Sequence, residues 1–515
     1  MSLASGAVLV RALILLCFTL LACWPQWCLP DWHGTEGRRI QIALEMAQSG
    51  DWMVPTLGGV PTWAKPPLHY WLLGVGSEWF GTNPWSMRLP AVLGLFAAAC
   101  MAMELLRRWF GREAGWVGAL GVLLSPVVIA EFPSAEIDPL FASLTAMSLW
   151  CLATGVGREQ RSLVLWSGVL GGLAMLQKGP PYFMFAGGAY LVWWRRRGLR
   201  FAVSHFVPLF LVTLAYYVPL WLFCVNPGEM LAVANEETLG RITTFEWRHI
   251  TSTPGFWVRA VAIQMPFVMW CFWEWRGARD ARMDPADLTL RMCSGAAVLV
   301  VVVLTFFPGR PTRYLLPNVL LFTFAVAPAV AHFAAQQRAL GAFSRRGLLI
   351  LGAGGAVALL VIPFVGGPVP LAALGLALVV ALGPTLVTTP RQLVAYCLLL
   401  PLVMAWTVLL DRSLSWPDSA RARTGAGLVL RRELDRLGVG TDLVTHGHID
   451  GPLVLAAGLL PKGDESARAN PTTHWLLHER AEDPVRMPKE YVERLRICVP
   501  GQTFVVRERT GGAPR

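Results

Sequence analysis

The chain has 515 residues, of which 55% are hydrophobic and only 15% are charged, and its mean hydropathy is +0.50. Soluble domains contain about 25% charged residues, so this composition excludes an ordinary soluble enzyme and predicts an all-α polytopic membrane protein. The formal net charge of +11 does not indicate a nucleic-acid partner, because most arginines stand in short segments between apolar runs. The ten cysteines form no CxxC pair, which excludes the common zinc-binding motifs.

Apolar runs of about 20 residues, the length of a membrane-spanning helix, recur along most of the chain. We predict about thirteen spanning helices, near residues 8–27, 88–106, 115–131, 137–155, 162–177, 180–194, 201–225, 255–275, 292–307, 314–334, 347–365, 369–387 and 392–410. The first run resembles a secretory signal, but no small-residue cleavage site follows it, so we predict an uncleaved span.

The composition turns polar after residue 410. One helical pattern, GLVLRRELDRLG, precedes four strand-like runs, TDLVTHG, HWLLHER, RLRICVP and TFVVRER. We therefore predict two domains, a transmembrane domain over residues 1–410 and a small soluble α/β domain over residues 411–515.

Alternate short loops between the predicted spans carry most of the arginines. These are Arg107, Arg108 and Arg112; Arg158 and Arg161; Arg195, Arg196, Arg197 and Arg200; Arg276, Arg279, Arg282 and Arg291; Arg338, Arg345 and Arg346; and Arg391. The positive-inside rule places these loops on the cytoplasmic side. The remaining loops, including the long segments 28–87 and 226–254, are then extracytoplasmic, and so is the C-terminal domain.

The first long outer loop predicts two helices that lie at the membrane interface. In TEGRRIQIALEMAQSG, Thr35 is a suitable N-cap and Glu36 falls in the first turn. The second helix follows the run KPPLHYW. Proline is excluded from a helix interior but fits its start, so Lys65 is expected to stand at the N-terminal edge of this helix.

Charged and tyrosine side chains on the outer side have a structural interpretation as helix caps, surface charges or interfacial anchors. Their location on one side of the membrane favours a functional interpretation, a polar cavity that faces outward. Carboxylates able to take a proton, next to cations able to neutralise a phosphate, fit the transfer of a group from a lipid phosphate. The residues concerned are Asp31, Glu36, Arg38, Lys65, Asp138, Lys178, Glu236, Arg241, Arg310, Arg313 and Tyr314.

The order TEGRRIQIALEMAQSGDW followed by KPPLHYW resembles the first outer loop of the polyprenyl-phosphate-sugar glycosyltransferases. This GT-C family of integral-membrane enzymes includes the aminoarabinose transferase of lipid A modification and the protein O-mannosyltransferases. The resemblance continues through Asp138, LQKGP and RYLLP. In the C-terminal tail, only the position of the domain in the chain matches, and no motif does. It implies an inverting glycosyltransferase of the bacterial inner membrane, with a polyprenyl-phosphate-linked sugar as donor and an active site on the extracytoplasmic face. The acceptor, a lipid A, another glycan or a protein hydroxyl, stays open.

The resemblance also implies a role for each matching residue. Glu36 or Asp31 would deprotonate the acceptor hydroxyl. The departing lipid phosphate would be stabilised by Lys65, Arg38, Arg310 and Tyr314, of which Arg310 stands where the family usually has lysine. Supporting positions are Asp138, Lys178, Glu236, Arg241 and His69.

Three departures from the family pattern concern its carboxylates and its metal site. Thr35 stands where the family has its first acid, which is usually the proposed base, and Ala64 replaces a glutamate before KPP. Glu237 replaces a histidine that can join that glutamate in holding a metal. We therefore predict no bound divalent metal and no other cofactor.

Two alternatives belong to other classes of protein. A transporter or lipid-handling protein would bind or flip a polyprenyl lipid without transfer, but transporters usually show paired repeats and charges near the midplane. A non-catalytic scaffold on the same fold is the second alternative, which the changes at Thr35 and Ala64 keep open.

Overall fold

A computed structural model describes the chain in segments. These are residues 3–27, 35–198, 200–223, 255–257, 287–305, 312–336, 387–414, 429–437, 443–446, 475–479, 491–499 and 502–509, with single residues at 29, 32, 228, 260 and 380. The chain divides into two compact units. The first unit comprises Met1–Cys28, Leu89–Pro133 and Ile137–Ser413, and the second comprises Leu29–Arg88, Ser134–Glu136 and Leu414–Arg515. The division into domains at residue 410 stays a prediction.

Helices make up the described part of the first unit. They are α1 (Leu3–Trp27), α4 (Pro84–Phe110, which begins in the second unit), α5 (Arg112–Leu124), α6 (Pro126–Glu131), α7 (Ile137–Gly157), α8 (Arg161–Lys178), α9 (Pro181–Arg197), α10 (Ala202–Phe223), α16 (Leu288–Thr305), the 3-10 turn η2 (Thr312–Leu315), α17 (Leu316–Ala334) and α20 (Pro390–Leu414). Within the described residues, 6 helices are long and apolar enough to cross a membrane. This confirms a polytopic helical membrane protein, whereas the count of about thirteen spans stays a prediction.

The predicted span over residues 115–131 is wrong in one respect, because the structure divides it into α5 and α6. Pro126 lacks a backbone N–H and disfavours helical geometry in the residue before it. Ser125 accordingly adopts an extended conformation, with φ −63° and ψ 134°. The predicted spans 255–275, 347–365 and 369–387 lie almost entirely outside the described residues.

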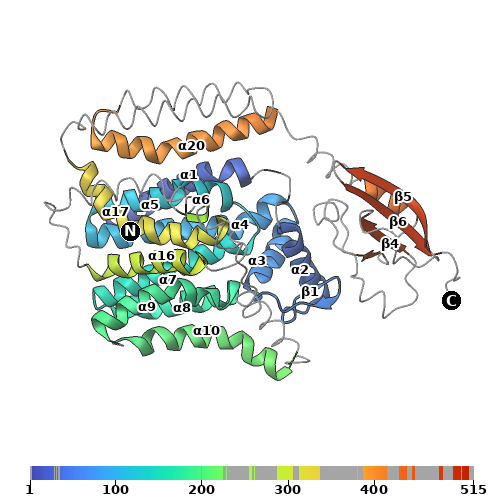
Figure 1. Cartoon of the computed structure of the whole chain (residues 1–515), viewed down its shortest axis with the longest axis horizontal. Helices are drawn as coiled ribbons and strands as arrows, with labels where there is room; N and C mark the ends of the chain where they lie inside the picture. Colours follow the sequence, from blue (N-terminus) through green and yellow to red (C-terminus); the bar gives the residue numbers. More distant parts are fainter. Residues whose placement is uncertain are drawn as a thin grey trace. The chain divides into compact units, whose positions relative to one another are not determined.

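Helix α7 forms the core of the first unit and is buried along nearly its whole length. Figure 1 shows α7 beside α8, α9 and α16, and α10 lies against α8. Many of its residues are small, which lets neighbouring helices approach closely in an apolar environment. Trp150 of α7 stacks on Phe324 of α17 with 5.0 Å between ring centroids, and the Ser148 hydroxyl donates to the Ser167 carbonyl of α8 at 2.7 Å.

The N-terminal part of the second unit is a pair of packed helices, α2 (Glu36–Ser49) and α3 (Leu68–Phe80), joined through a short hairpin of β1 (Thr56–Leu57) and β2 (Val60–Pro61). Ile40, Met46, Tyr70 and Leu73 form the core between the two helices. The apolar residues of α2 recur at helical spacing, so a single face is buried while the other stays polar.

The segment before α3 confirms the expected helix start, because α3 begins at Leu68 directly after Lys65 and the two prolines. Helix α3 in turn packs tightly on the GDW turn. The indole N–H of Trp71 donates to the Trp52 carbonyl at 2.6 Å. A Cβ atom on Gly74 would lie 2.8 Å from the Trp52 ring, so only glycine leaves room for it.

The C-terminal part of the second unit contains a four-stranded sheet with the order β3-β4-β6-β5. The strands are β3 (Leu443–His446), β4 (Trp475–Glu479), β5 (Tyr491–Val499) and β6 (Gln502–Arg509). The β3/β4 pair is parallel and the other pairs are antiparallel. Each strand coincides with one of the four strand-like runs, and residues 429–436 are helical within the predicted GLVLRRELDRLG helix.

Candidate functional site

The first unit brings four site residues together at the ends of three helices, a group that we call the Asp138 cluster. It consists of Asp138 in the first turn of α7, Lys178 at the end of α8, and Arg313 and Tyr314 in η2 before α17. One carboxylate oxygen of Asp138 is ion-paired with the Lys178 ammonium, and the other lies 3.3 Å from Nε of Arg313.

Aromatic rings complete the surroundings of Lys178. Its ammonium lies 4.3 Å from the centroid of the Tyr314 ring and 5.3 Å from that of Phe141. Such contacts stabilise a cation where water is scarce. Counting only these four side chains, two cations face one carboxylate, and 29% of the Arg313 side chain is exposed. Cations placed in this way are suited to an anionic ligand.

The local fold explains why these side chains meet. Helix α8 ends at Gly179, which has a φ of 86°, a conformation that favours glycine. The Gln177 side chain donates to the Ile137 carbonyl at 3.2 Å, which ties the end of α8 to the start of α7. An acidic group near a helix N-terminus and a basic group near a C-terminus are each favourable, so Asp138 and Lys178 also serve as helix termini, as the sequence predicts.

The second unit holds Glu36 in a buried ion pair with Arg88. Nε and Nη2 of Arg88 donate to the two carboxylate oxygens of Glu36, each at 2.9 Å, and both side chains are fully buried. The Ala135 N–H donates to the same carboxylate at 2.6 Å, and Arg88 also donates to the Leu29 carbonyl at 2.7 Å. A bidentate pair of this kind fixes the start of α2 firmly.

Thr35 occupies the expected N-cap position of α2, but its hydroxyl does not cap the helix. The Thr35 hydroxyl instead donates to one oxygen of Glu136 at 2.7 Å, and its backbone N–H donates to the other at 2.6 Å. The Glu136 carboxylate, which lies outside the helix, therefore accepts the hydrogen bonds donated at the start of α2, where negative charge is favourable.

The remaining described candidates surround α2 and α3. The Lys65 ammonium donates to the Ala64 carbonyl at 2.8 Å and is half-buried. His69 is buried, and its Nε2 lies 2.8 Å from the carbonyl oxygen of Ala135, the residue whose N–H binds Glu36. Arg38 is exposed on α2. The other predicted positions, Asp31, Glu236, Arg241 and Arg310, lie outside the described residues.

Sequence reasoning missed two charged residues that the structure engages at these positions, namely Arg88 and Glu136. Arg88 opens a run that we interpreted as an apolar span, and Glu136 precedes the start of α7. A charged side chain at the edge of an apolar helix is costly unless it has a partner. This cost indicates that Arg88 and Glu136 need partners, but it does not identify those partners.

Within the segments that the structure describes, no group of three or more His, Cys, Asp or Glu side chains has a geometry that could hold a metal ion. The altered position Glu237 lies outside these segments. Metal independence therefore stays a prediction.

Comparison with known proteins finds similar sequences over part of the chain. Residues 64–223 match the family described as dolichyl-phosphate-mannose-protein mannosyltransferase. The undecaprenyl phosphate-alpha-4-amino-4-deoxy-L-arabinose arabinosyl transferase 2 of Pseudomonas fluorescens is 27% identical over 226 residues, which cover 42% of this chain and 38% of that protein. The transferase of Pseudomonas savastanoi pv. phaseolicola is 26% identical over 356 residues, covering 65% of this chain and 62% of the relative. Over these segments the chain is similar to the polyprenyl-phosphate-sugar glycosyltransferases.

Solved structures show a similar fold. ArnT from Cupriavidus metallidurans bound to undecaprenyl phosphate superposes with a TM-score of 0.73 at 18% identity, covering 98% of this chain and 97% of ArnT. Its apo state gives a TM-score of 0.69 at the same identity. The matched sequence segments span less than two thirds of the length of the two curated transferases. The family match includes Lys65, Arg88, Glu136, Asp138 and Lys178.

Proposed function

We propose that this protein is an inverting glycosyltransferase that moves a sugar from a polyprenyl-phosphate donor to a hydroxyl acceptor. The observation that carries the proposal is the Asp138 cluster, in which Lys178 and Arg313 converge on one carboxylate beside the Tyr314 ring. The relatives named as arabinosyl transferases, and the ArnT structure with undecaprenyl phosphate, support a donor of this chemical class.

The reaction explains why cations are needed at this point. The acceptor oxygen forms a bond to the anomeric carbon of the sugar, and the bond from that carbon to the phosphate oxygen breaks. The leaving phosphate keeps the electron pair, so its charge changes from −1 as a diester to about −2 as a monoester. Lys178 and Arg313 stabilise this additional charge, which develops in the transition state and is absent from the substrate. Asp138 orients both cations while no phosphate is bound.

The acceptor hydroxyl must lose its proton to a base, for which the sequence offers Asp31 and Glu36. Both oxygens of Glu36 are occupied by Arg88, and one of them also binds the Ala135 N–H. We therefore assign Glu36 to holding the start of α2, and retain Asp31 as the sequence-based candidate for the base. Glu136, bound to Thr35, is the further carboxylate that the structure adds for mutational testing.

We further propose that the reaction takes place on the extracytoplasmic face of a bacterial inner membrane. The arginine-rich loops support this orientation through the positive-inside rule, and the C-terminal domain would lie on the same outer side. Lys65, Arg38 and Arg310 would assist in binding the donor phosphate, with His69, Glu236 and Arg241 in supporting positions. A lipid, a glycan or a protein can supply the acceptor hydroxyl.

The experiment supplies purified protein in detergent with a panel of polyprenyl-phosphate sugars and measures the release of free polyprenyl phosphate. Parallel reactions contain or lack a crude envelope acceptor fraction, and a chelator serves as the control for metal dependence. We expect acceptor-dependent release that survives chelation. Binding of the donor without release from any member of the panel would instead support the transporter or scaffold alternative.

A further inference from the structure

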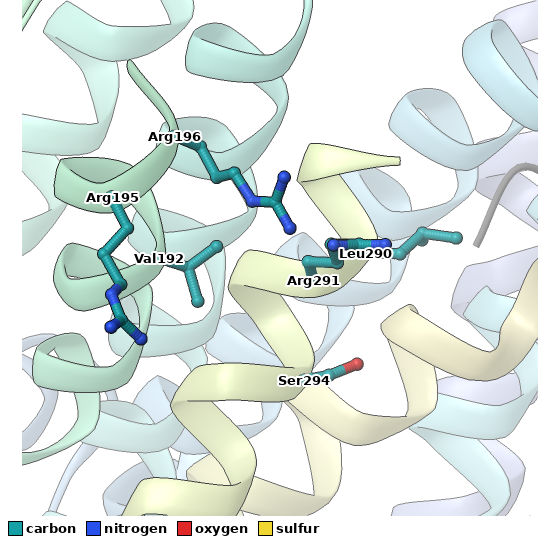
Figure 2. A pocket seen from close by; sticks show the side chains of 6 residues that line it. All are labelled: Val192, Arg195, Arg196, Leu290, Arg291 and Ser294. Carbon is teal, nitrogen blue, oxygen red and sulfur yellow. The ribbon is translucent and has the colours of Figure 1, made fainter. Parts of the chain in front are cut away.

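We propose that the first unit binds the phosphate group of an anionic lipid at the arginine-rich ends of α9 and α16. The site is a cavity of about 490 Å³ lined by Val192, Arg195, Arg196, Leu290, Arg291 and Ser294. Figure 2 shows Arg195 and Arg196 on α9 and Arg291 on α16, with the Arg196 side chain extending toward α16. Lys178 precedes α9 whereas these arginines end it, so roughly 25 Å of helix separates this cavity from the Asp138 cluster. The site is therefore distinct from that of the proposed reaction.

A close crossing of α9 and α16 explains where the cavity begins. A Cβ atom on Gly188 would lie 2.1 Å from the carbonyl oxygen of Gly295, so the two backbones are nearly in contact. Arg195 follows Gly188 by two helical turns on the same face, and Arg196 flanks it. Arg291 stands one turn before Gly295 on the facing side of α16. Beyond the glycine crossing, both helices therefore present guanidinium groups to a common space.

Arg195 and Arg196 of this space have no partner among the acidic side chains described at the same end. Asp287 is paired with Arg158 at 2.6 Å, and Glu159 is paired with Arg197 at 3.2 Å and with Arg200 at 3.1 Å. Among the described residues, the cavity is lined by three arginines and by no carboxylate. Like charges in one cavity repel each other, and a bound anion relieves that repulsion. Guanidinium groups match phosphate oxygens in both charge and geometry.

An apolar stripe along α16 favours a lipid over a soluble phosphate. Ser294 of the cavity is followed at four-residue spacing by Val298 and Val302, which are 62% and 42% exposed. An acyl chain can lie along these valines while the headgroup phosphate occupies the cavity. Basic pockets between spanning helices on the cytoplasmic side bind anionic headgroups in this way, and the positive-inside rule assigns this end to the cytoplasmic side.

The test compares lipid retention by the wild type and by the double variant Arg195→Gln/Arg196→Gln, each in detergent with phosphatidylglycerol or phosphatidylcholine. Native mass spectrometry then measures the affinity for each lipid. An arginine near an anionic headgroup strengthens binding about fivefold, so the double variant should bind phosphatidylglycerol roughly 30-fold more weakly. The matched control Arg108→Gln/Arg391→Gln removes two cations outside the cavity and should keep the wild-type preference.

Other outcomes overturn the proposal. Equal retention of the two lipids by the wild type would do so, as would the same loss of affinity in both double variants. Thermal unfolding checks that the variants fold, and Arg291→Lys, which keeps the charge but loses the guanidinium fork, should weaken binding to a smaller extent. The last measurement adds inorganic phosphate to the wild type with bound phosphatidylglycerol. If it displaces phosphatidylglycerol at equal concentration, the site takes soluble phosphate and the assignment to a lipid fails.

Discussion

Glu36 can serve either as the structural partner of Arg88 or as the catalytic base, and the stability of the buried pair distinguishes these roles. Breaking a buried ion pair leaves an uncompensated charge, which typically costs about 3–5 kcal/mol. We therefore expect Glu36→Gln to lower the free energy of unfolding by that amount, as measured by denaturant titration in detergent. The double variant Glu36→Met/Arg88→Met should recover much of the loss, because neither charge then remains buried. Wild-type stability of Glu36→Gln together with lost turnover would instead assign the catalytic base to Glu36.

The Thr35–Glu136 contact gives a second residue-level prediction. If Glu136 only satisfies the start of α2, Glu136→Gln can still accept from the Thr35 hydroxyl through its amide oxygen, and turnover should change by less than about tenfold. If Glu136 removes the acceptor proton, the same variant loses that function and turnover should fall by about 10²–10⁴. Initial rates of donor turnover distinguish the two results, and Asp31→Asn, which removes the sequence-based candidate for the base, is measured beside this variant.

At the scale of residues, the sequence predicted which side chains stand at helix ends, but it did not predict their ion-pair partners. The sequence predicts Lys178 at a helix end and Thr35 at a helix start, and the structure agrees because both follow from local rules. The pairing of Glu36 with Arg88, 52 residues later in the chain, follows from no local rule. Partners so far apart can be identified only once the tertiary fold is known.

At the scale of elements, the packing of α3 on the GDW turn rests on one glycine. Gly74→Ala places a Cβ atom 2.8 Å from the Trp52 ring, so the indole must shift. Overpacking of this kind usually costs about 1–3 kcal/mol. We expect a lower thermal midpoint for Gly74→Ala, measured by the loss of soluble protein in detergent on heating.

Gly76→Ala in the same helix is the matched control for this substitution. The nearest atom to its Cβ would be 3.6 Å away, an ordinary contact. Alanine favours a helix over glycine by roughly 0.5–1 kcal/mol, so this variant should match or exceed the wild-type midpoint. Equal midpoints for the two variants would show that the close approach of Trp52 to Gly74 does not penalise a side chain at residue 74.

The boundaries of helices were predictable where glycine and proline mark them. The expected spans 162–177 and 180–194 agree closely with α8 and α9, which are separated by Gly179 and Pro180, and the four C-terminal strands follow their β-rich runs. The β1–β2 hairpin was not foreseen, because its strands have only two residues each. It is held from outside by Glu45, whose carboxylate accepts from the Thr56 hydroxyl and from the Gly58 N–H.

At the scale of the whole molecule, the account requires that Arg38 and the arginine-rich loops lie on opposite sides of the membrane. Single cysteines at Arg38 and at Arg108, both exposed, test this in a background without other cysteines. A membrane-impermeant maleimide should label Arg38→Cys in intact spheroplasts and Arg108→Cys only after lysis. Labelling of both before lysis, or of Arg108→Cys alone, would contradict the proposed outward-facing reaction.

The most direct measurement of the central claim is donor turnover by Lys178→Met, followed as release of labelled polyprenyl phosphate from a donor that the wild type uses. Loss of one preorganised group that stabilises developing charge typically lowers the rate by about 10²–10³. We predict a loss of this size in protein that is still folded, and partial activity in Lys178→Arg, which keeps the charge. Wild-type turnover in Lys178→Met would contradict the account, because the lipid phosphate would then leave without help from the Asp138 cluster.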